Sequence, residues 1–148
     1  KAGQDIMLRY QPDEGYEFDR WESSQVAEIK DDKFVMPATN VEVKAYFKIK
    51  TFDVVFDMQG HGTQIESQRI DFGHKVTKPT DPVDEGYAFE GWYKEQECLN
   101  AWDFDNDTVK NDTTLYASWL ANKYDIKYMS YLNLIQLLNR HLSDNLIQ

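Results

Sequence analysis

One nine-residue pattern occurs twice in this chain, and its recurrence limits the possible folds more than any other feature of the sequence. The segment Asp-Glu-Gly-Tyr-Glu-Phe-Asp-Arg-Trp at residues 13–21 returns 71 positions later as Asp-Glu-Gly-Tyr-Ala-Phe-Glu-Gly-Trp at residues 84–92, with six of nine residues identical. The match extends to both sides: Gly3 and Ile6 correspond to Gly73 and Val76, and Val43, Ala45 and Phe47 correspond to Leu115, Ala117 and Trp119. The displacement drifts by only one position on each side, which indicates two duplicated structural units with small loop changes.

The two units differ in completeness. The second unit has more than thirty residues before its signature, starting near Thr51, whereas the first has only twelve. The first unit is therefore expected to lack its opening strands, and Lys1 is expected to lie inside a longer array. The sequence predicts three parts: a partial first unit (residues 1–49), a complete second unit (residues 50–120) and a tail (residues 121–148).

Apolar and polar residues alternate in several runs of both units, as they do in strands that bury one face. These runs lie at residues 6–10, 41–47, 52–58 and 115–119. Gly60 and Gly62 follow the third run, so residues 52–58 and 65–72 are expected to form an antiparallel hairpin. Before Trp119 no helical period extends over ten residues, and both units are therefore expected to be β-rich.

The tail has a different pattern, because its apolar residues from Tyr128 onward follow the spacing of an amphipathic helix. These residues are Tyr128, Tyr131, Leu132, Ile135, Leu138 and Leu142. Three alternatives follow for this apolar stripe: it folds back on a sheet, associates with another chain, or belongs to an ill-ordered end. We interpret the tail as a separate element and not as a third repeat.

The missing opening of the first unit predicts an open sheet edge, and such edges recruit strands. We expect the tail, with residues 124–131 as a strand, or a neighbouring chain to cover this edge.

Charge and cysteine content exclude several classes of protein. The chain has 16 basic and 26 acidic side chains, a formal charge of -10. Nucleic-acid binding is not expected, because phosphate contacts need clustered Lys and Arg. Membrane insertion is not expected either, since no apolar stretch approaches the roughly 20 residues that span a bilayer. The single cysteine, Cys98, excludes an intrachain disulfide framework.

The sequence contains no pattern typical of catalysis or of cofactor binding. His61, His74 and His141 are scattered, without the spacing of metal ligands. Cys98 has no neighbouring CxxC partner, and no phosphate-binding glycine loop is present. We therefore expect no catalytic residue, no cofactor and no metal.

Residues 103–107 have the acidic spacing that opens a calcium loop, with Asp103, Asp105 and Asp107 in the first three ligand positions. Such a loop needs Gly and Glu where this chain has Thr108 and Thr114. A polar turn with backbone hydrogen bonds to its Asp side chains is the expected structure.

The motifs of the second unit follow one another in a fixed order. They are the first strand at residues 52–57, Lys-Pro at 78–79, Asp-Pro at 81–82, Glu-Gly-Tyr at 85–87, Phe-Glu-Gly-Trp-Tyr at 89–93, Ala-Trp-Asp-Phe at 101–104 and Thr-Leu-Tyr-Ala-Ser-Trp at 114–119. Through these motifs residues 51–120 resemble the Listeria–Bacteroides repeat, which also occurs in the B-repeat region of internalin-type bacterial surface proteins. Residues 1–49 resemble a truncated, divergent copy, through Pro12, Glu-Gly-Tyr-Glu-Phe at 14–18, Trp21, Met-Pro-Ala at 36–38 and the run 41–47.

The resemblance implies a small β-grasp-like module, repeated in arrays on secreted or surface-anchored bacterial proteins and without enzymatic chemistry. The expected fold class is β-rich α+β, with two tandem β-grasp-like modules and a C-terminal amphipathic helix. The expected function is a non-enzymatic spacer or adhesion stalk, located outside the cell or on the bacterial cell surface.

Aromatic residues are candidates for both packing and binding. A module of about 70 residues has a shallow core, so large rings are expected to supply much of the buried area. The rings expected in the core are Phe18, Trp21, Phe89, Trp92 and Trp119.

Tyr93 and Trp102 stand beside the charged residues Lys94 and Asp103, which indicates a surface position. They are the candidate partner-binding residues of an alternative function, a module that binds a carbohydrate or a protein. The partners considered are a host or cell-surface protein, a glycan, or another copy of the chain bound through the C-terminal helix or the open edge of the first unit.

Overall fold

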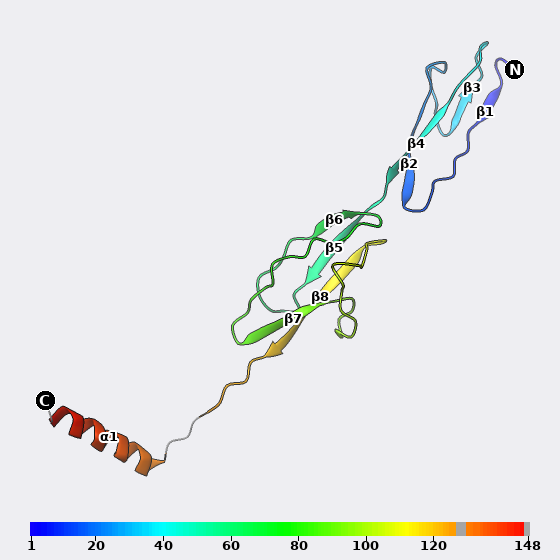
Figure 1. Cartoon of the computed structure of the whole chain (residues 1–148). Helices are drawn as coiled ribbons and strands as arrows, with labels where there is room; N and C mark the ends of the chain where they lie inside the picture. The colour runs from blue at the N-terminus through cyan, green and yellow to red at the C-terminus, as the bar shows by residue number, and fades with distance from the viewer. Residues whose placement is uncertain (127–129, 147–148) are drawn as a thin grey trace.

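The computed structural model describes residues 1–126 and 130–146, which form eight strands and one helix (Figure 1). The elements are β1 (Asp5–Met7), β2 (Tyr16–Glu22), β3 (Lys33–Val35), β4 (Lys44–Ile49), β5 (Thr51–Asp57), β6 (Gln68–Asp71), β7 (Tyr87–Tyr93), β8 (Thr113–Ala121) and α1 (Tyr131–Leu146). The first unit contains β1 to β4 and the second contains β5 to β8. The described part of the chain is therefore β-rich with a C-terminal helix, as the sequence predicts.

The second unit is a four-stranded sheet in the order β6-β5-β8-β7. Strands β5 and β6 form the predicted antiparallel hairpin, with Thr51 opposite Asp71 and Val54 opposite Gln68. Strands β7 and β8 are antiparallel, whereas the central strands β5 and β8 are parallel. Apolar alternation predicts that these strands exist, but it carries no information on strand direction.

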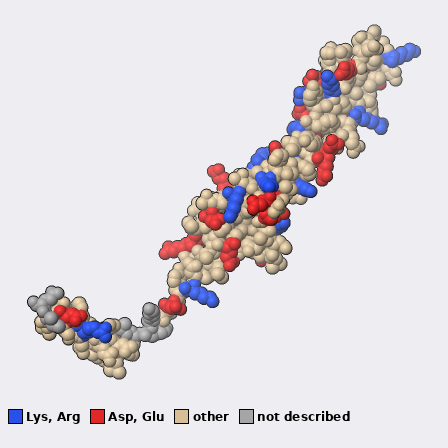
Figure 2. All heavy atoms as spheres, in the orientation of Figure 1, with Lys and Arg blue, Asp and Glu red and all other residues tan. Residues whose placement is uncertain are grey.

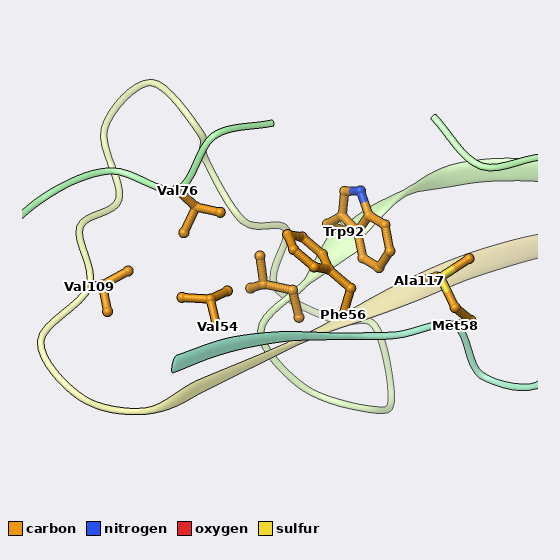
Figure 3. Packing of buried hydrophobic residues seen from close by; sticks show 8 residues of the cluster. Val54, Phe56, Met58, Val76, Trp92, Val109 and Ala117 are labelled. Atoms are coloured by element: carbon orange, nitrogen blue, oxygen red, sulfur yellow. The ribbon is translucent and has the colours of Figure 1, made fainter. Parts of the chain in front are cut away.

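The core of the second unit lies on one face of this sheet (Figure 3). Its buried residues are Val54, Phe56, Met58, Val76, Trp92, Val109, Leu115 and Ala117. Trp92 is 2% exposed, and its ring packs edge-on against Phe56 at a centroid distance of 4.9 Å. Phe89 and Trp119 pack against the same cluster, so the three rings predicted for the core of this unit lie in or beside it.

The first unit is thinner, with two separate antiparallel pairs, β1-β3 and β2-β4. Its rings form a partly exposed cluster in which Tyr10 stacks on Phe18 at 4.4 Å and meets Trp21 edge-on at 5.9 Å. The indole N–H of Trp21 donates to the carboxylate of Asp32 at 2.7 Å. Phe18 and Trp21 thus pack together as predicted, although neither is fully buried.

Two strands of the first unit are shorter than the alternation predicts. Strand β1 ends at Met7, because the next amide, that of Leu8, donates to the carbonyl of Asp32 outside the strand pair. Strand β4 begins only at Lys44, and the amide of Glu42 donates instead to the side chain of Gln25. Loop hydrogen bonds therefore replace sheet pairing at these ends.

The duplication extends to backbone detail. Both signature glycines have left-handed backbone, with φ of 83° at Gly15 and 82° at Gly86. The carbonyl of each glycine accepts a 2.8 Å hydrogen bond from the residue just after the last strand of its unit, Lys50 or Asn122. Strand pairs β2-β4 and β7-β8 also shift register at the same place, after Phe18 and after Phe89.

The predicted helix is confirmed as α1, although its expected first residue, Tyr128, lies outside the described residues. Every described side chain of α1 is exposed except that of Ile135, which is half-buried. The alternative in which the apolar stripe folds back on a sheet is therefore wrong for the described helix.

The expectation that the tail covers the open edge of the first unit is also wrong for the described residues. Among the described residues, strand β4 pairs only with β2, and residues 122–126 belong to no strand. Residues 127–129 of the expected strand lie outside the described residues, and Tyr131 begins α1. The reason is the route of the chain, because β8 leaves the second unit at the end remote from the first unit (Figure 1).

A polar turn at residues 103–107 holds Trp102 and Phe104 against the second unit. The carboxylate of Asp103 accepts backbone hydrogen bonds from Asp105 at 2.9 Å and from Asn106 at 3.2 Å. The carboxylate of Asp107 accepts from the backbone of Asp103 at 2.8 Å and from the ammonium of Lys94 at 2.9 Å. The predicted polar turn is confirmed, and in the described part of the chain no three His, Cys, Asp or Glu side chains gather as metal ligands.

Removing the ring at the centre of the core is expected to destabilise the second unit strongly. Phe56 is 1% exposed, and Phe56→Ala should lower the free energy of unfolding by about 3–5 kcal/mol. Urea unfolding followed by tryptophan fluorescence measures the change. The matched control is Val55→Ala on the opposite face of β5, which is 44% exposed and should cost no more than about 1 kcal/mol. Equal losses in the two variants would contradict this account of the core.

The polar turn is expected to weaken in acid. Hydrogen bonds from the side chain of Asn106 and the backbone of Asp105 lower the pKa of Asp103 below 3.8, and bonds from Lys94 and the backbone of Asp103 lower the pKa of Asp107. Their contribution to stability is complete above pH 3.8 and is lost as the pH falls through the lowered pKa values. An NMR titration of the carboxyl carbons should show that Lys94→Met raises the pKa of Asp107 and leaves the pKa of Asp103 low. An unchanged pKa of Asp107 in this variant would refute the role given to Lys94.

Candidate functional site

The two predicted partner-binding residues, Tyr93 and Trp102, line the same open depression of about 210 Å³ on the second unit. The residues that complete its lining are Lys78, Asp81, Phe89, Glu90, Gly91, Trp92, Ala101 and Phe104. Tyr93 and Trp102 are both half-buried, so each ring keeps part of its surface accessible. The two rings that the sequence singles out thus lie in one depression, and the structure adds the acidic and basic side chains around them.

Backbone hydrogen bonds fix the position of the two rings. Strand β7 ends at Tyr93, which forms a bridge with Ala101 after the chain turns back. The amide of Trp102 then donates to the carbonyl of Trp92 at 2.8 Å. The Lys94 ammonium lies 5.6 Å from the centre of the Trp102 ring, a cation–π distance.

The depression combines aromatic faces with hydrogen-bonding groups. Among the described residues, the indole N–H groups of Trp92 and Trp102 are buried without a hydrogen-bond partner, which is uncommon in folded proteins. Asp81 and Glu90 offer carboxylate acceptors, and Glu90 already accepts from the hydroxyl of Ser118 at 3.0 Å. Ring faces beside the carboxylates of Asp81 and Glu90 and the ammonium of Lys78 match the chemistry of a hydroxyl-rich ligand.

The second feature is the junction between the two units, which a single residue, Lys50, connects. The amide of Lys50 donates to the carbonyl of Gly15, and its carbonyl accepts from the amide of Phe72, both at 2.8 Å. The Phe72 ring covers Gly15, where an added Cβ would lie 2.6 Å from ring atom Cε1 and nearer still to Cδ1. Glycine is therefore required here for its space as well as for its φ of 83°.

The contact between Gly15 and Phe72 is not predicted from the sequence. A left-handed turn alone would explain the signature glycine, since Gly86 occupies the same turn in the second unit without such a contact. The available signal is the aromatic residue just before Gly73, at the end of the hairpin that the first unit lacks.

The remaining reactive side chains lie near a further depression without forming a nucleophile pair. His61 places Nδ1 2.8 Å from a carboxylate oxygen of Asp84. Cys98 Sγ lies 3.3 Å from the amide nitrogen of Gln59. Among the described residues, the hydrogen bonds of Cys98 involve Gln59 and backbone carbonyls but no histidine.

Charged side chains of both signs are scattered over the two units on the face shown in Figure 2. Within the described ranges, no helix combines the length and the apolar character needed to cross a bilayer.

Comparisons with known proteins cover most of the chain. The family model of the Listeria-Bacteroides repeat domain matches residues 52–118, and that of the divergent InlB B-repeat domain matches residues 1–51. The chain is 34% identical to a protein of Evansella cellulosilytica described as a Gly-rich membrane protein. This match extends over 118 residues, which are 79% of this chain and 14% of the relative. It is also 30% identical to internalin H of Listeria monocytogenes. That match extends over 112 residues, which are 74% of this chain and 20% of internalin H.

The chain thus spans a fifth or less of the length of these relatives. Two consecutive family matches account for residues 1–118. The chain belongs to the Listeria–Bacteroides repeat family, with a divergent InlB B-repeat followed by a Listeria–Bacteroides repeat.

Proposed function

We propose that this chain is a non-enzymatic spacer or adhesion-stalk segment of a bacterial cell-surface or secreted protein. In this proposal residues 1–49 and 50–120 are two tandem β-grasp-like modules, and residues 121–148 are a tail. The observation that carries the proposal is the tight junction at Lys50, because a stalk needs consecutive units that hold a fixed direction.

The junction leaves little room for independent motion. A flexible linker needs several unconstrained residues, whereas the amide and the carbonyl of Lys50 are both hydrogen-bonded, one to each unit. The buried Gly15 adds direct packing between the units, since the Phe72 ring lies against it. Two such units in series would hold the functional end of a surface protein at a distance from the end that is attached to the cell.

Other observations support the same function. The strand order β6-β5-β8-β7, with parallel central strands, supports a β-grasp-like module. The relatives include internalin H and a described membrane protein, which supports a location at the cell surface. The charge of -10 favours a soluble and extended array through self-repulsion. Association between copies, through α1 or the edge of β4, belongs to the same proposal.

Breaking the junction is expected to let the two units turn independently. Gly15→Ala forces a Cβ into the Phe72 ring, so we expect a broader distribution of dimensions in small-angle X-ray scattering and different rotational correlation times for the two units by NMR relaxation. The matched control is Gly86→Ala, which has the same type of φ but no heavy atom within 4 Å of the added Cβ. The control should show only the backbone strain, about 1–2 kcal/mol, and should keep the two units aligned. A wild-type chain that already tumbles as two independent units would refute the stalk.

A second function, a module that binds a carbohydrate or a surface protein, is supported by the depression at Tyr93 and Trp102. Aromatic faces stack on the apolar faces of sugar rings, and Asp81 and Glu90 provide acceptors for hydroxyl groups. We favour a glycan over a protein because the depression is small and its polar groups surround half-buried rings.

Trp102→Ala is expected to abolish saccharide binding if this second function holds. Binding on a glycan array, followed by NMR titration of the bound saccharide, measures it, and the dispersion of the Leu115 and Val54 methyl signals shows whether the core remains folded. The control is Tyr124→Ala, which removes a ring that is 74% exposed and lies outside the depression. Absence of any saccharide that shifts the Trp102 indole signal in the wild-type chain would end this second proposal.

A further inference from the structure

Each unit has a bulge in the strand that carries its signature, and the residues at the two bulges differ in charge. The bulge in β7 contains Glu90 and Gly91, and the one in β2 contains Asp19 and Arg20, at the same place in the signature. Bulges are common beside binding sites, because the extra residue redirects a side chain. Glu90 and Gly91 line the depression described above, so the first unit serves as an internal comparison for this site.

In the first unit the bulge supplies its own cation. The guanidinium carbon of Arg20 lies 4.2 Å from the centre of the Tyr46 ring, which is a cation–π distance. The same guanidinium forms an ion pair with the carboxylate of Asp19. A ring face and a carboxylate thus hold a positive charge together at this place in the unit.

The second unit keeps a ring and a carboxylate at its bulge but has glycine in place of the arginine. Glu90 corresponds to Asp19, and the Tyr93 ring comes within 3.7 Å of a Cβ position built on Gly91. Gly91 has a φ of 140°, so a basic side chain at this position would strain the backbone. The hydroxyl of Ser118, opposite Gly91, donates to the carboxylate of Glu90 at 3.0 Å but leaves its negative charge in place.

The lysines near this bulge lie beside other carboxylates. Lys78 Nζ is 3.9 Å from a carboxylate oxygen of Asp81, and Lys94 Nζ is 2.8 Å from one of Asp107. None of the ion pairs within residues 1–126 and 130–146 involves Glu90. The lining of the depression contains one lysine and two carboxylates, a formal charge of -1. Its charge and its ring faces therefore both favour a cationic ligand.

We propose that the depression at Tyr93 and Trp102 binds an amino sugar whose amine is free and protonated. The ammonium lies beside Glu90 and the Tyr93 ring, as the Arg20 guanidinium lies beside a carboxylate and a ring in the first unit. The sugar ring stacks on Trp102, and Asp81 accepts hydrogen bonds from its hydroxyl groups. The proposal rests on the second function given above, saccharide binding, and adds to it the charge of the ligand.

The test is an NMR titration of the 148-residue chain with two disaccharides of the same linkage, a glucosamine dimer and its N-acetylated form. Acetylation removes the positive charge and keeps the sugar rings. At a pH that keeps the amines protonated, the glucosamine dimer should shift the Trp102 indole and Tyr93 ring signals. Its affinity should exceed that of the acetylated dimer by about threefold to tenfold, as expected for one exposed ion pair with one cation–π contact.

Two substitutions that each remove one negative charge separate the local contact from the overall acidity of the chain. Glu90→Gln keeps an acceptor for the Ser118 hydroxyl, and it should weaken binding of the glucosamine dimer by about twofold to fivefold without affecting the acetylated dimer. The matched control is Glu97→Gln, at an exposed residue outside the depression, which should change neither affinity. Dispersed Leu115 methyl signals show that each variant is folded. Equal losses in the two variants, or an unchanged affinity in Glu90→Gln, would overturn the proposal.

The same titrations distinguish the charge of the ligand from saccharide binding itself. Equal affinities for the two disaccharides would overturn the amine and leave the second function standing. If neither disaccharide shifts the Trp102 indole signal, the amine is refuted, and the glycan array decides whether the second function is refuted with it. Shifts caused by N-acetyl-arginine amide but by neither disaccharide would identify a basic protein segment as the ligand, against the amino sugar proposed.

Discussion

The structure depends on one backbone constraint, the hydrogen bond between the signature glycine of each unit and the residue just after its last strand. Gly15 binds Lys50 and Gly86 binds Asn122 in this way, both at 2.8 Å. The bond closes the antiparallel pair at its end and fixes where the chain leaves the unit. A left-handed glycine is needed because the turn that presents this carbonyl has a positive φ, which other residues adopt only with strain.

The units differ in how much of their aromatic surface they bury around this constraint. In the second unit the hairpin β5-β6 adds Val54 and Phe56, and Trp92 becomes almost completely buried against them. The first unit has no such hairpin, so Phe18 and Trp21 pack on one another and on Tyr10, and Phe18 also packs on Phe47. The same signature therefore lies in a buried core in the second unit and in a partly exposed cluster in the first. The difference arises because only the second unit has the side chains of the hairpin β5-β6 to pack against the signature rings.

Much of this arrangement can be predicted from the sequence. The repeat predicts two related units, alternation predicts the hairpin of β5 and β6, and helical spacing predicts α1. Tyr93 and Trp102 are predicted as surface rings because charged residues adjoin them, and they do line one depression. These predictions succeed because each depends on local sequence patterns.

Other features depend on contacts between distant residues, which local patterns do not encode. The parallel pairing of β5 with β8 joins residues about sixty positions apart. The contact of Gly15 with Phe72 joins the two units, and a turn alone already explains the glycine. The shortened strands β1 and β4 end where loop groups of Asp32 and Gln25 compete for the backbone amides. The carboxylate of Asp81 lies beside Tyr93 and Trp102 in the depression only because the fold brings these distant parts of the chain together.

The parallel central pair has a mechanical consequence. Tension along the chain enters the second unit at Thr51, the first residue of β5, and leaves it at Ala121, the last residue of β8. Since the neighbouring strands β5 and β8 run in the same direction, these two points lie at opposite ends of the pair, and pulling slides the strands past one another. The ladder from Val54 to Asp57 is then loaded in shear, so its hydrogen bonds share the force and must break together instead of opening one by one.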